Sequence, residues 1–305
     1  MFRKHTRRAA KAAFAISIGV ALLLGGTAHA AKQSAAAGPT VTIGTKNFTE
    51  QYILGQLYKQ ALEAKGFKVV YKENIGSSEL IDTALKSGKI NFYPEYTGVI
   101  VADLAKLTAP KSAAAAYTAA KKFEEGRGNT LLSKTPFYDS DAFGMLTSTA
   151  KKLGVKTISD MKKVKSFSYG AFPECKTRIT CLLGLKQIYG LTQTKFVPLA
   201  GISTYTALDQ GKITAGDVFS TDPQLVGPKY TVLTDTKHIF GFQNVAPVLS
   251  KKLAAAGGTK LASTVNAVSA KLSVKAMIAM NKAVAIDKKS PEDVASAFLT
   301  ANKLK

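Results

Sequence analysis

The apolar positions between residues 41 and 93 alternate between the pattern of strands and the pattern of helices. Short apolar runs at 41–44, 67–71 and 90–93 predict strands, and apolar positions at helical spacing predict a helix in each interval between them. Asn47, three residues before Glu50, is predicted to cap the first helix. A β-α-β-α-β order with short connections is typical of a parallel sheet in an α/β protein.

The second half of the chain repeats this alternation. Strand patterns at 165–170, 194–199 and 216–220 alternate with helical patterns at about 181–189 and 203–210. Two more apolar runs, 229–235 and 244–250, predict further strands, and the segment from residue 253 onward is helical. The pattern predicts two α/β units in one chain.

One sequence motif occurs in both halves. "ALKSGKINFYPEYTG" begins at Ala84 and "ALDQGKITAGDVFST" at Ala207, and their alignment places Phe219 on Tyr96. Ligands of open α/β sheets bind beyond the carboxyl ends of strands, so two rings at equivalent strand ends are expected on opposite walls of one cleft. The alternative is that helix-Gly-strand joints are common and that both rings are core residues.

The N-terminus has the organisation of a secretory signal peptide. A basic segment without acids precedes the apolar stretch 12–26, and Ala28-His29-Ala30 is a small-x-small cleavage site. We predict cleavage near Ala30 and export to the periplasm, with a retained anchor as the alternative. The mature chain is not expected to span a membrane, because 12–26 is too short and no other segment approaches the required length.

The mature chain is strongly basic. Without the five basic residues of the signal peptide, 37 basic residues face 20 acidic ones, a net charge of +17. This excess leaves open an extracellular polyanion-binding protein. Nucleic acid is not expected, because the lysines occur singly or in pairs, without aromatic interleaving.

The two cysteines and the single mature histidine exclude several chemistries. Cys175 and Cys181 are expected to form a disulfide in an oxidising compartment. Neither a metal set nor a C-x-x-C redox pair is present, and His238 has no nucleophile at a recognisable spacing. We therefore predict no enzyme activity, no cofactor and no metal.

A cleft walled by aromatic rings suits a cation. Ring faces attract cations, and a quaternary ammonium group, which has no N–H to donate, is held by rings and a carboxylate. Asp141, in the extended segment between the two halves, is the candidate counter-charge. Lys46, just before the first helix, and Arg178, between the cysteines, are candidates for binding an anionic group.

Four segments identify a family. "VTIGTKNFTEQYILGQLYKQALEAKGFKV", "ALKSGKINFYPEYTGV", "PECKTRITCLLGLKQIYGL" and "VFSTDPQL" resemble the substrate-binding proteins of osmoprotectant ABC transporters of the glycine betaine/choline/proline type. The resemblance implies an α/β type II periplasmic binding protein fold, with two lobes joined by two crossover segments. It also implies a permease and an ATPase as partners.

The family encloses the trimethylammonium group in a tyrosine cage, which this sequence alters. Tyr96 keeps its cage position, whereas Asp141, Phe219 and Gln243 stand where the family has other cage tyrosines. Lys46 matches the carboxylate-binding lysine, and Arg178 lies in the segment that supplies the arginine. These exchanges favour choline, or a larger betaine such as ergothioneine, over simple glycine betaine.

The sequence thus predicts an extracytoplasmic solute-binding protein that captures a quaternary ammonium compound and delivers it to an ABC importer as a monomer. The alternative ligands are another zwitterionic solute, such as ergothioneine, or an amino-acid derivative. The expected organisation is a signal peptide at 1–30, a flexible lead at 31–39, one lobe from 40–138 plus 244–305, and a second lobe from 139–243.

Overall fold

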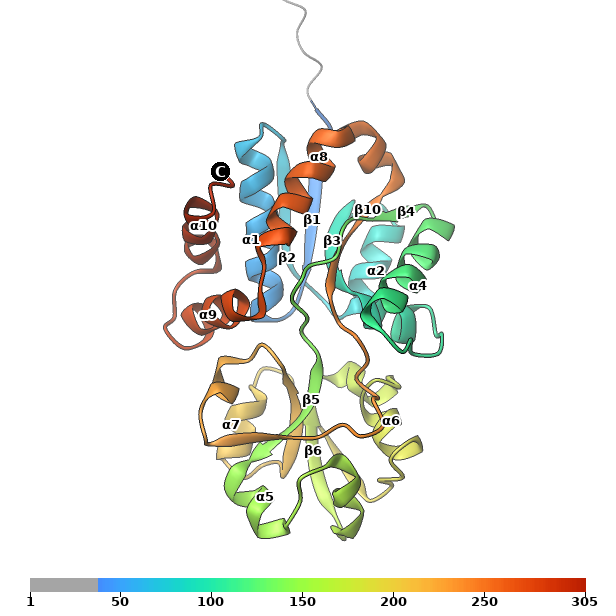
Figure 1. The fold of residues 1–305 in the computed structure, drawn as a ribbon, viewed down its shortest axis with the longest axis vertical. Coiled ribbons are helices and arrows are strands. Elements are labelled where there is room, and N and C mark those ends of the chain that lie inside the picture. Colours follow the sequence, from blue (N-terminus) through green and yellow to red (C-terminus); the bar gives the residue numbers. More distant parts are fainter. Residues whose placement is uncertain (1–37) are drawn as a thin grey trace, which may run out of the picture. The chain divides into compact units, whose positions relative to one another are not determined.

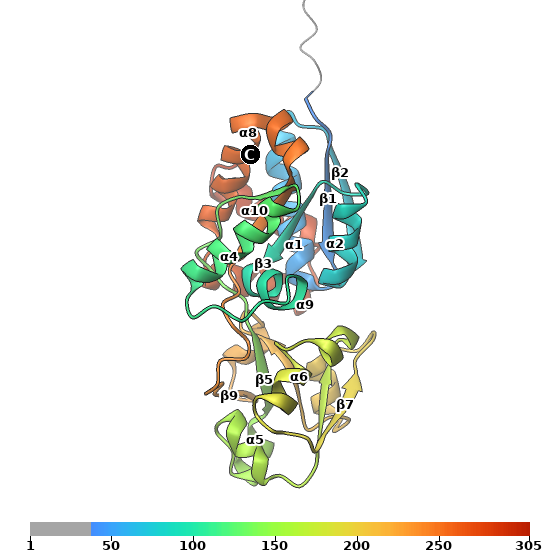
Figure 2. The same ribbon diagram turned by 90° about the vertical axis from the view of Figure 1, so that its right-hand side faces the viewer.

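The computed structural model describes residues 38–305, which contain two five-stranded sheets with helices packed against them (Figures 1 and 2). The first sheet has the strand order β2-β1-β3-β10-β4, and the second has the order β7-β6-β8-β5-β9. The predicted signal peptide, 1–30, lies outside the described residues.

The first sheet combines strands from both ends of the chain. Strand β1 pairs in parallel with β2 and β3, whereas β10 runs antiparallel between β3 and β4. The strands are β1 (Val41–Lys46), β2 (Val69–Gly76), β3 (Phe92–Tyr96), β4 (Asn129–Leu131) and β10 (Val245–Ser250).

Helices cover both faces of the first sheet, because its strands alternate apolar side chains between the faces. Phe92 packs with one set of helices, and its neighbour Tyr93 packs with the other. On one face lie α1 (Thr49–Ala64), α8 (Lys251–Lys271), α9 (Val274–Ala285) and α10 (Pro291–Ala301); on the other lie α2 (Ser78–Lys86) and α4 (Ala113–Gly126) (Figure 1). A short turn of α3 (Thr97–Val99) and η1 (Ile100–Leu104) follows β3.

The second sheet is formed entirely by residues between 141 and 233. Its strands are β5 (Asp141–Leu146), β6 (Phe167–Ala171), β7 (Thr194–Pro198), β8 (Ala215–Phe219) and β9 (Tyr230–Leu233). Its helical segments are α5 (Thr147–Leu153), η2 (Ile158–Lys163), η3 (Pro173–Thr177), α6 (Leu182–Gln187), α7 (Thr204–Asp209) and η4 (Pro223–Val226).

The two sheets have equivalent topologies. In each, three strands in the order second-first-third run in parallel, and a fourth strand lies antiparallel beside the third. The third strands are β3 and β8, which end on Tyr96 and Phe219. The repeated motif in the sequence therefore corresponds to equivalent strands.

Strand β3 continues through Pro94, whereas the sequence predicted a strand that stops before the proline. Pro94 lies opposite Pro247 of β10. A hydrogen bond three residues further along this ladder, from Thr97 N to Asn244 O, is 2.9 Å long. Since hydrogen-bonded and non-hydrogen-bonded pairs alternate, the two prolines occupy a pair that needs no N–H group. Tyr96 is therefore a strand residue, not a residue of the turn.

The predicted cap of α1 is wrong. The residue before the helix is Phe48, and no side chain caps this end. The buried Glu50 carboxylate accepts hydrogen bonds from the Tyr96 hydroxyl (2.9 Å), the Thr221 hydroxyl (2.6 Å) and the Asn281 amide (3.1 Å). Burial raises the pKa of Glu50, and these donors oppose the shift. Glu50 therefore binds residues distant in sequence and does not take part in capping α1.

The chain passes between the sheets twice, through residues 132–140 and 234–244. The two segments touch, because Tyr138 and Asn244 form an antiparallel bridge and Asp139 N donates to Gln243 O (3.1 Å). Strand β5 begins directly after the first passage and β10 directly after the second (Figure 1).

Candidate functional site

A cavity of about 50 Å³ lies between residues of the two sheets, at the ends of β1, β3 and β8. Its lining contains every site residue that the sequence predicted: Lys46, Tyr96, Asp141, Arg178, Phe219 and Gln243. A second cavity of about 170 Å³ adjoins it and shares Phe48, Asp139, Phe172, Asp217 and Phe219 with it.

Three aromatic rings stand in sequence along the cavity. Phe48 stacks on Phe219, with ring centroids 5.4 Å apart and planes 9° apart, and on Tyr96 at 6.2 Å and 22°. Phe48 thus joins the rings of the two equivalent strands into one aromatic wall. The sequence analysis missed it, although its position between a strand end and a helix start was a usable signal.

Lys46 is buried at the end of β1 with its charge neutralised by the protein. Its ammonium group lies 2.6 Å from Glu95 Oε1, 3.2 Å from Ser78 Oγ and 4.2 Å from the centre of the Tyr96 ring. The same Glu95 oxygen accepts from Tyr96 N at 2.8 Å. The ion pair therefore sets the position of Lys46 on one face of the Tyr96 ring.

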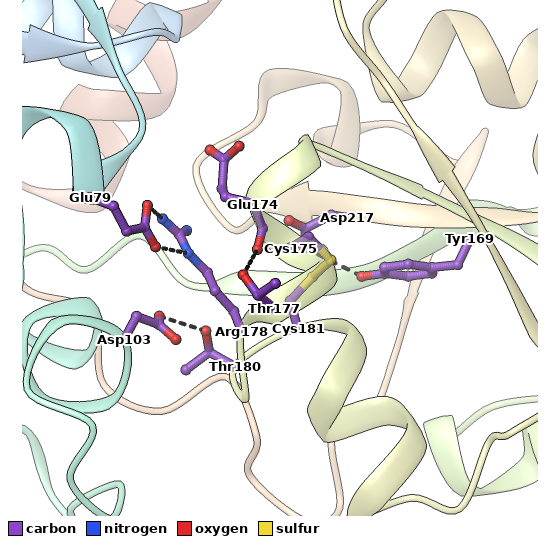
Figure 3. The surroundings of a disulfide bond; sticks show 10 residues. All are labelled: Glu79, Asp103, Tyr169, Glu174, Cys175, Thr177, Arg178, Thr180, Cys181 and Asp217. Atoms are coloured by element: carbon purple, nitrogen blue, oxygen red, sulfur yellow. Dashed lines mark hydrogen bonds and ion pairs between the residues drawn. A yellow bond between two sulfur atoms is a disulfide. The ribbon is translucent and has the colours of Figure 1, made fainter.

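Arg178 is held in a short loop closed by the predicted disulfide. Cys175 and Cys181 are bonded, and Figure 3 shows Arg178 projecting from the loop toward Glu79 of α2. The guanidinium donates to both Glu79 oxygens, at 3.1 and 2.9 Å. Partial burial raises the pKa of Glu79, but the Arg178 charge and hydrogen bonds outweigh this and lower it to about 2.

A second contact joins the same loop to the first sheet's helices. Thr180 Oγ1 donates to Asp103 Oδ2 at 2.8 Å (Figure 3). Asp103 is buried, and the loss of hydration raises its pKa to about 6, against the opposing effects of Arg178 and Thr180. The disulfide loop thus carries two polar contacts to the other side of the cavity.

Asp141 shares its side of the cavity with a second acid, Asp217. The register pairs Asp141 with Phe219 and Phe143 with Asp217, so the two acids lie on adjacent strands, and both line the cavity. Burial raises the pKa of both. The sequence analysis missed Asp217, although a period of two places it on the same strand face as Phe219.

Gln243 lines the cavity, and both the oxygen and the nitrogen of its side-chain amide form hydrogen bonds within the protein. Its Oε1 accepts from Val99 N at 3.1 Å, and its Nε2 donates to Phe240 O at 3.1 Å. A Cβ on Gly98 would lie within 2.8 Å of this amide, so Gly98 leaves the space that Gln243 occupies. Gln243 connects the second passage between the sheets to the turn after β3.

Two findings concern membranes and metals. None of the helices within 38–305 is long and apolar enough to cross a membrane. In the same part of the chain, no group of three or more His, Cys, Asp or Glu side chains could hold a metal ion.

Two α/β lobes, two passages between them and a pocket lined from both sides define a type II periplasmic binding protein fold. The chain belongs to the family of the substrate binding domain of ABC-type glycine betaine transport systems, which matches residues 39–301. Members of this family are solute-binding components of transporters.

Named relatives agree with this assignment. A glycine-betaine-binding protein of Pseudomonas aeruginosa is 30% identical, covering 87% of this chain and 88% of its own. The ergothioneine transport permease/ergothioneine binding protein EgtU of Helicobacter pylori is 28% identical, covering 85% of this chain and 47% of its own. A solved structure described as a glycine betaine/carnitine/choline ABC transporter has a TM-score of 0.69 at 24% identity, covering 88% and 99%, which shows the shared fold.

Proposed function

We propose that this protein captures a quaternary ammonium compound in the cavity between its lobes and delivers it to an ABC importer. The observation that carries the proposal is the aromatic wall of Tyr96, Phe48 and Phe219 beside the Asp141 carboxyl group. Ring faces and a carboxylate are the groups that hold a cation without N–H donors.

In this proposal the protein works by lobe closure. The lobes are 40–138 plus 244–305 and 139–243, and the cavity is lined from both. A ligand that contacts both lobes favours the closed state by its higher affinity for that state. The permease then recognises the closed, loaded monomer. The protein has no enzyme activity and uses no cofactor.

The proposed setting is the periplasm. The N-terminal sequence supports export and cleavage near Ala30. Edman sequencing of the protein purified from periplasmic extract should begin near Ala31; an intact N-terminus would contradict the cleavage.

A panel of ligands tests the function. The mature protein should gain thermal stability with at least one of glycine betaine, choline, carnitine and ergothioneine, because a ligand that binds the native state stabilises it. No shift with any of them would reject the quaternary ammonium proposal. Binding should change little with added salt, whereas binding of a polyanion would weaken steeply.

The adjoining cavity favours a second candidate, a betaine longer than glycine betaine. It continues the first cavity past the aromatic wall and offers polar groups, including Glu50, Ser203 and Asp222. Ergothioneine is the test compound for this class. If it binds, Ser203→Val should weaken ergothioneine binding and leave choline binding unchanged.

A further inference from the structure

The second cavity is lined by acids and by no basic side chain. The first cavity contains a lysine and an arginine, whereas the described residues around the second include no Lys, Arg or His. Basic residues outnumber acidic ones in this chain, so composition alone does not predict such a wall. The carboxyl groups of the lining are those of Glu50, Asp139, Asp217 and Asp222.

These acids are not neutralised by ion pairing. Within residues 38–305, no ion pair contains any of the four. Burial raises the pKa of Glu50, Asp139 and Asp222, the last to about 6. Repulsion by Glu50 and Asp222 adds to the shift of Asp139. A cation in the second cavity offsets this repulsion and favours the ionised acids.

Asn281 of α9 adds a buried amide oxygen without a donor. Asn281 is 4% exposed and lines the cavity from the first lobe. Its Nδ2 donates to Glu50 Oε2 at 3.1 Å and to Thr221 O at 3.2 Å, whereas its Oδ1 has no hydrogen-bond partner in the described part of the chain. Leaving a buried acceptor without a donor is unfavourable, so this oxygen indicates a donor that comes from a ligand.

Further acceptors line the cavity from the second lobe. Gln224 of η4 has a buried Oε1 that likewise lacks a partner among the described residues. The described hydrogen bonds of Asp222 both end on its Oδ2, and those of Asp139 both end on its Oδ1. The other oxygen of each carboxyl group is left for a ligand. The cavity is therefore rich in acceptors on both sides.

We propose that the second cavity binds an organic cation with several N–H groups, a primary ammonium or a guanidinium, and that Asn281 Oδ1, Gln224 Oε1 and the surrounding carboxylates accept its hydrogen bonds. Both cations donate several hydrogen bonds and supply the charge that the lining lacks. The volume of about 170 Å³ is several times the roughly 30 Å³ of one water molecule, so it holds a group of several heavy atoms.

A metal ion does not fit this site. No group of three or more His, Cys, Asp or Glu side chains within the described residues could hold one. A quaternary ammonium group does not fit either, because it has no N–H group to offer the unpartnered oxygens. The proposal therefore goes beyond the proposed function and does not depend on it.

Methylation of the cation separates the two cavities. Ring faces attract a cation with or without N–H groups, whereas the second cavity needs the N–H groups. The probes are n-butylammonium chloride and its N,N,N-trimethyl derivative, titrated into the isotope-labelled mature protein and followed by amide NMR shifts. The first probe should give saturable shifts at residues 221–224 and around Asn281, and the trimethylated probe should not.

A variant tests the acceptors. Gln224→Met removes one unpartnered oxygen and breaks no described side-chain hydrogen bond, so it should weaken n-butylammonium binding by roughly tenfold or more. Asp222→Asn removes one negative charge and should weaken it as well. Gln187→Met, on the exposed side of α6, should bind as the wild type does.

Each result supports or overturns the site. Absence of saturable shifts near Gln224 and Asn281 overturns it, and so does equal affinity of the two probes at these residues. Both comparisons use the wild type, so they decide even if a variant fails to fold. Wild-type affinity in folded Gln224→Met and Asp222→Asn proteins overturns the assigned acceptors. A failure of every quaternary ammonium compound to bind rejects the proposed function and leaves this site standing.

Discussion

Phe48 is the residue that turns two separate rings into a wall. It belongs to neither β1 nor α1, and it stacks on Phe219 from the second sheet and Tyr96 from the first. The ring of Phe48 therefore contacts residues of both lobes. A change of the Phe48 side chain is therefore expected to affect both ligand binding and the approach of the two lobes.

Replacing Phe48 tests this role. Phe48→Ala should weaken binding of the preferred quaternary ammonium compound by about 1–2 kcal/mol, because a ring that attracts the cation is lost. Titration calorimetry measures the change. Phe242→Ala, which removes a ring that is 39% exposed, should bind as the wild type does. Equal affinities for all three proteins would remove Phe48 from the binding wall.

Glu50 and Asp217 show why single residues were harder to assign than patterns. Glu50 satisfies every local rule for a capping box, yet its partners are Tyr96, Thr221 and Asn281, which are distant in sequence. Local spacing carries no information about such partners. Strand alternation was enough to place Asp217 on the cavity side of β8, but its position on the strand next to Asp141 depends on the register of β5 and β8.

At the scale of elements, the hydrophobic pattern predicted most strands of both sheets and most helices, but it did not predict the short strand β4. The error at Pro94 arose because a proline is read as a strand end, whereas the strand's partner decides whether an N–H group is needed. Tyr96 and Phe219 were predicted from the repeated strand, whereas Gln243 was assigned from the family resemblance, and all three line the cavity. Which acids pair with Lys46 and Arg178 follows from tertiary packing and could not be predicted.

The disulfide loop between η3 and α6 is an element whose rigidity can be measured. Replacing both Cys175 and Cys181 by Ser should lower the free energy of unfolding by about 2 kcal/mol, since the bond closes a very short loop. Urea unfolding of the variant, and of the wild type with and without a reductant, checks the value. Equal stability of the two proteins would mean that the loop is held by its other contacts.

At the scale of the whole molecule, several side-chain hydrogen bonds join the lobes. Arg178 with Glu79, Thr180 with Asp103 and Thr221 with Glu50 each join residues of different lobes. In the proposed mechanism, a ligand that contacts both lobes adds to these contacts and favours the closed state.

Removing the ion pair between Arg178 and Glu79 should weaken the association of the two lobes in the ligand-free protein. Glu79 is 41% exposed, so Glu79→Gln is expected to weaken the interaction between the lobes by about 1 kcal/mol or less. Small-angle X-ray scattering should then give a larger radius of gyration for the ligand-free variant and the wild-type value at saturating ligand. Glu292→Gln, an exposed acid of α10, is the control. An unchanged ligand-free radius would show that this ion pair does not hold the lobes together.

Asp103 makes the stability of the protein depend on pH. Burial raises its pKa to about 6 from 3.8, so the folded protein binds more protons than the unfolded chain between these values. The free energy of unfolding therefore falls as pH rises through this interval, by about 2–3 kcal/mol. Urea unfolding of Asp103→Asn across this range should show a smaller fall. Identical profiles for variant and wild type would contradict the raised pKa.

The position of β10 between β3 and β4 also governs the order in which the sheets can form. A chain that emerges N-terminus first presents every strand of the second sheet by residue 233, but the first sheet lacks its interior strand until residues 245–250 have followed. Contacts that close long loops form slowly. The first sheet, whose strands β1 to β4 are synthesised first, is thus completed last. Until then β3 and β4 lack β10, the strand that lies between them.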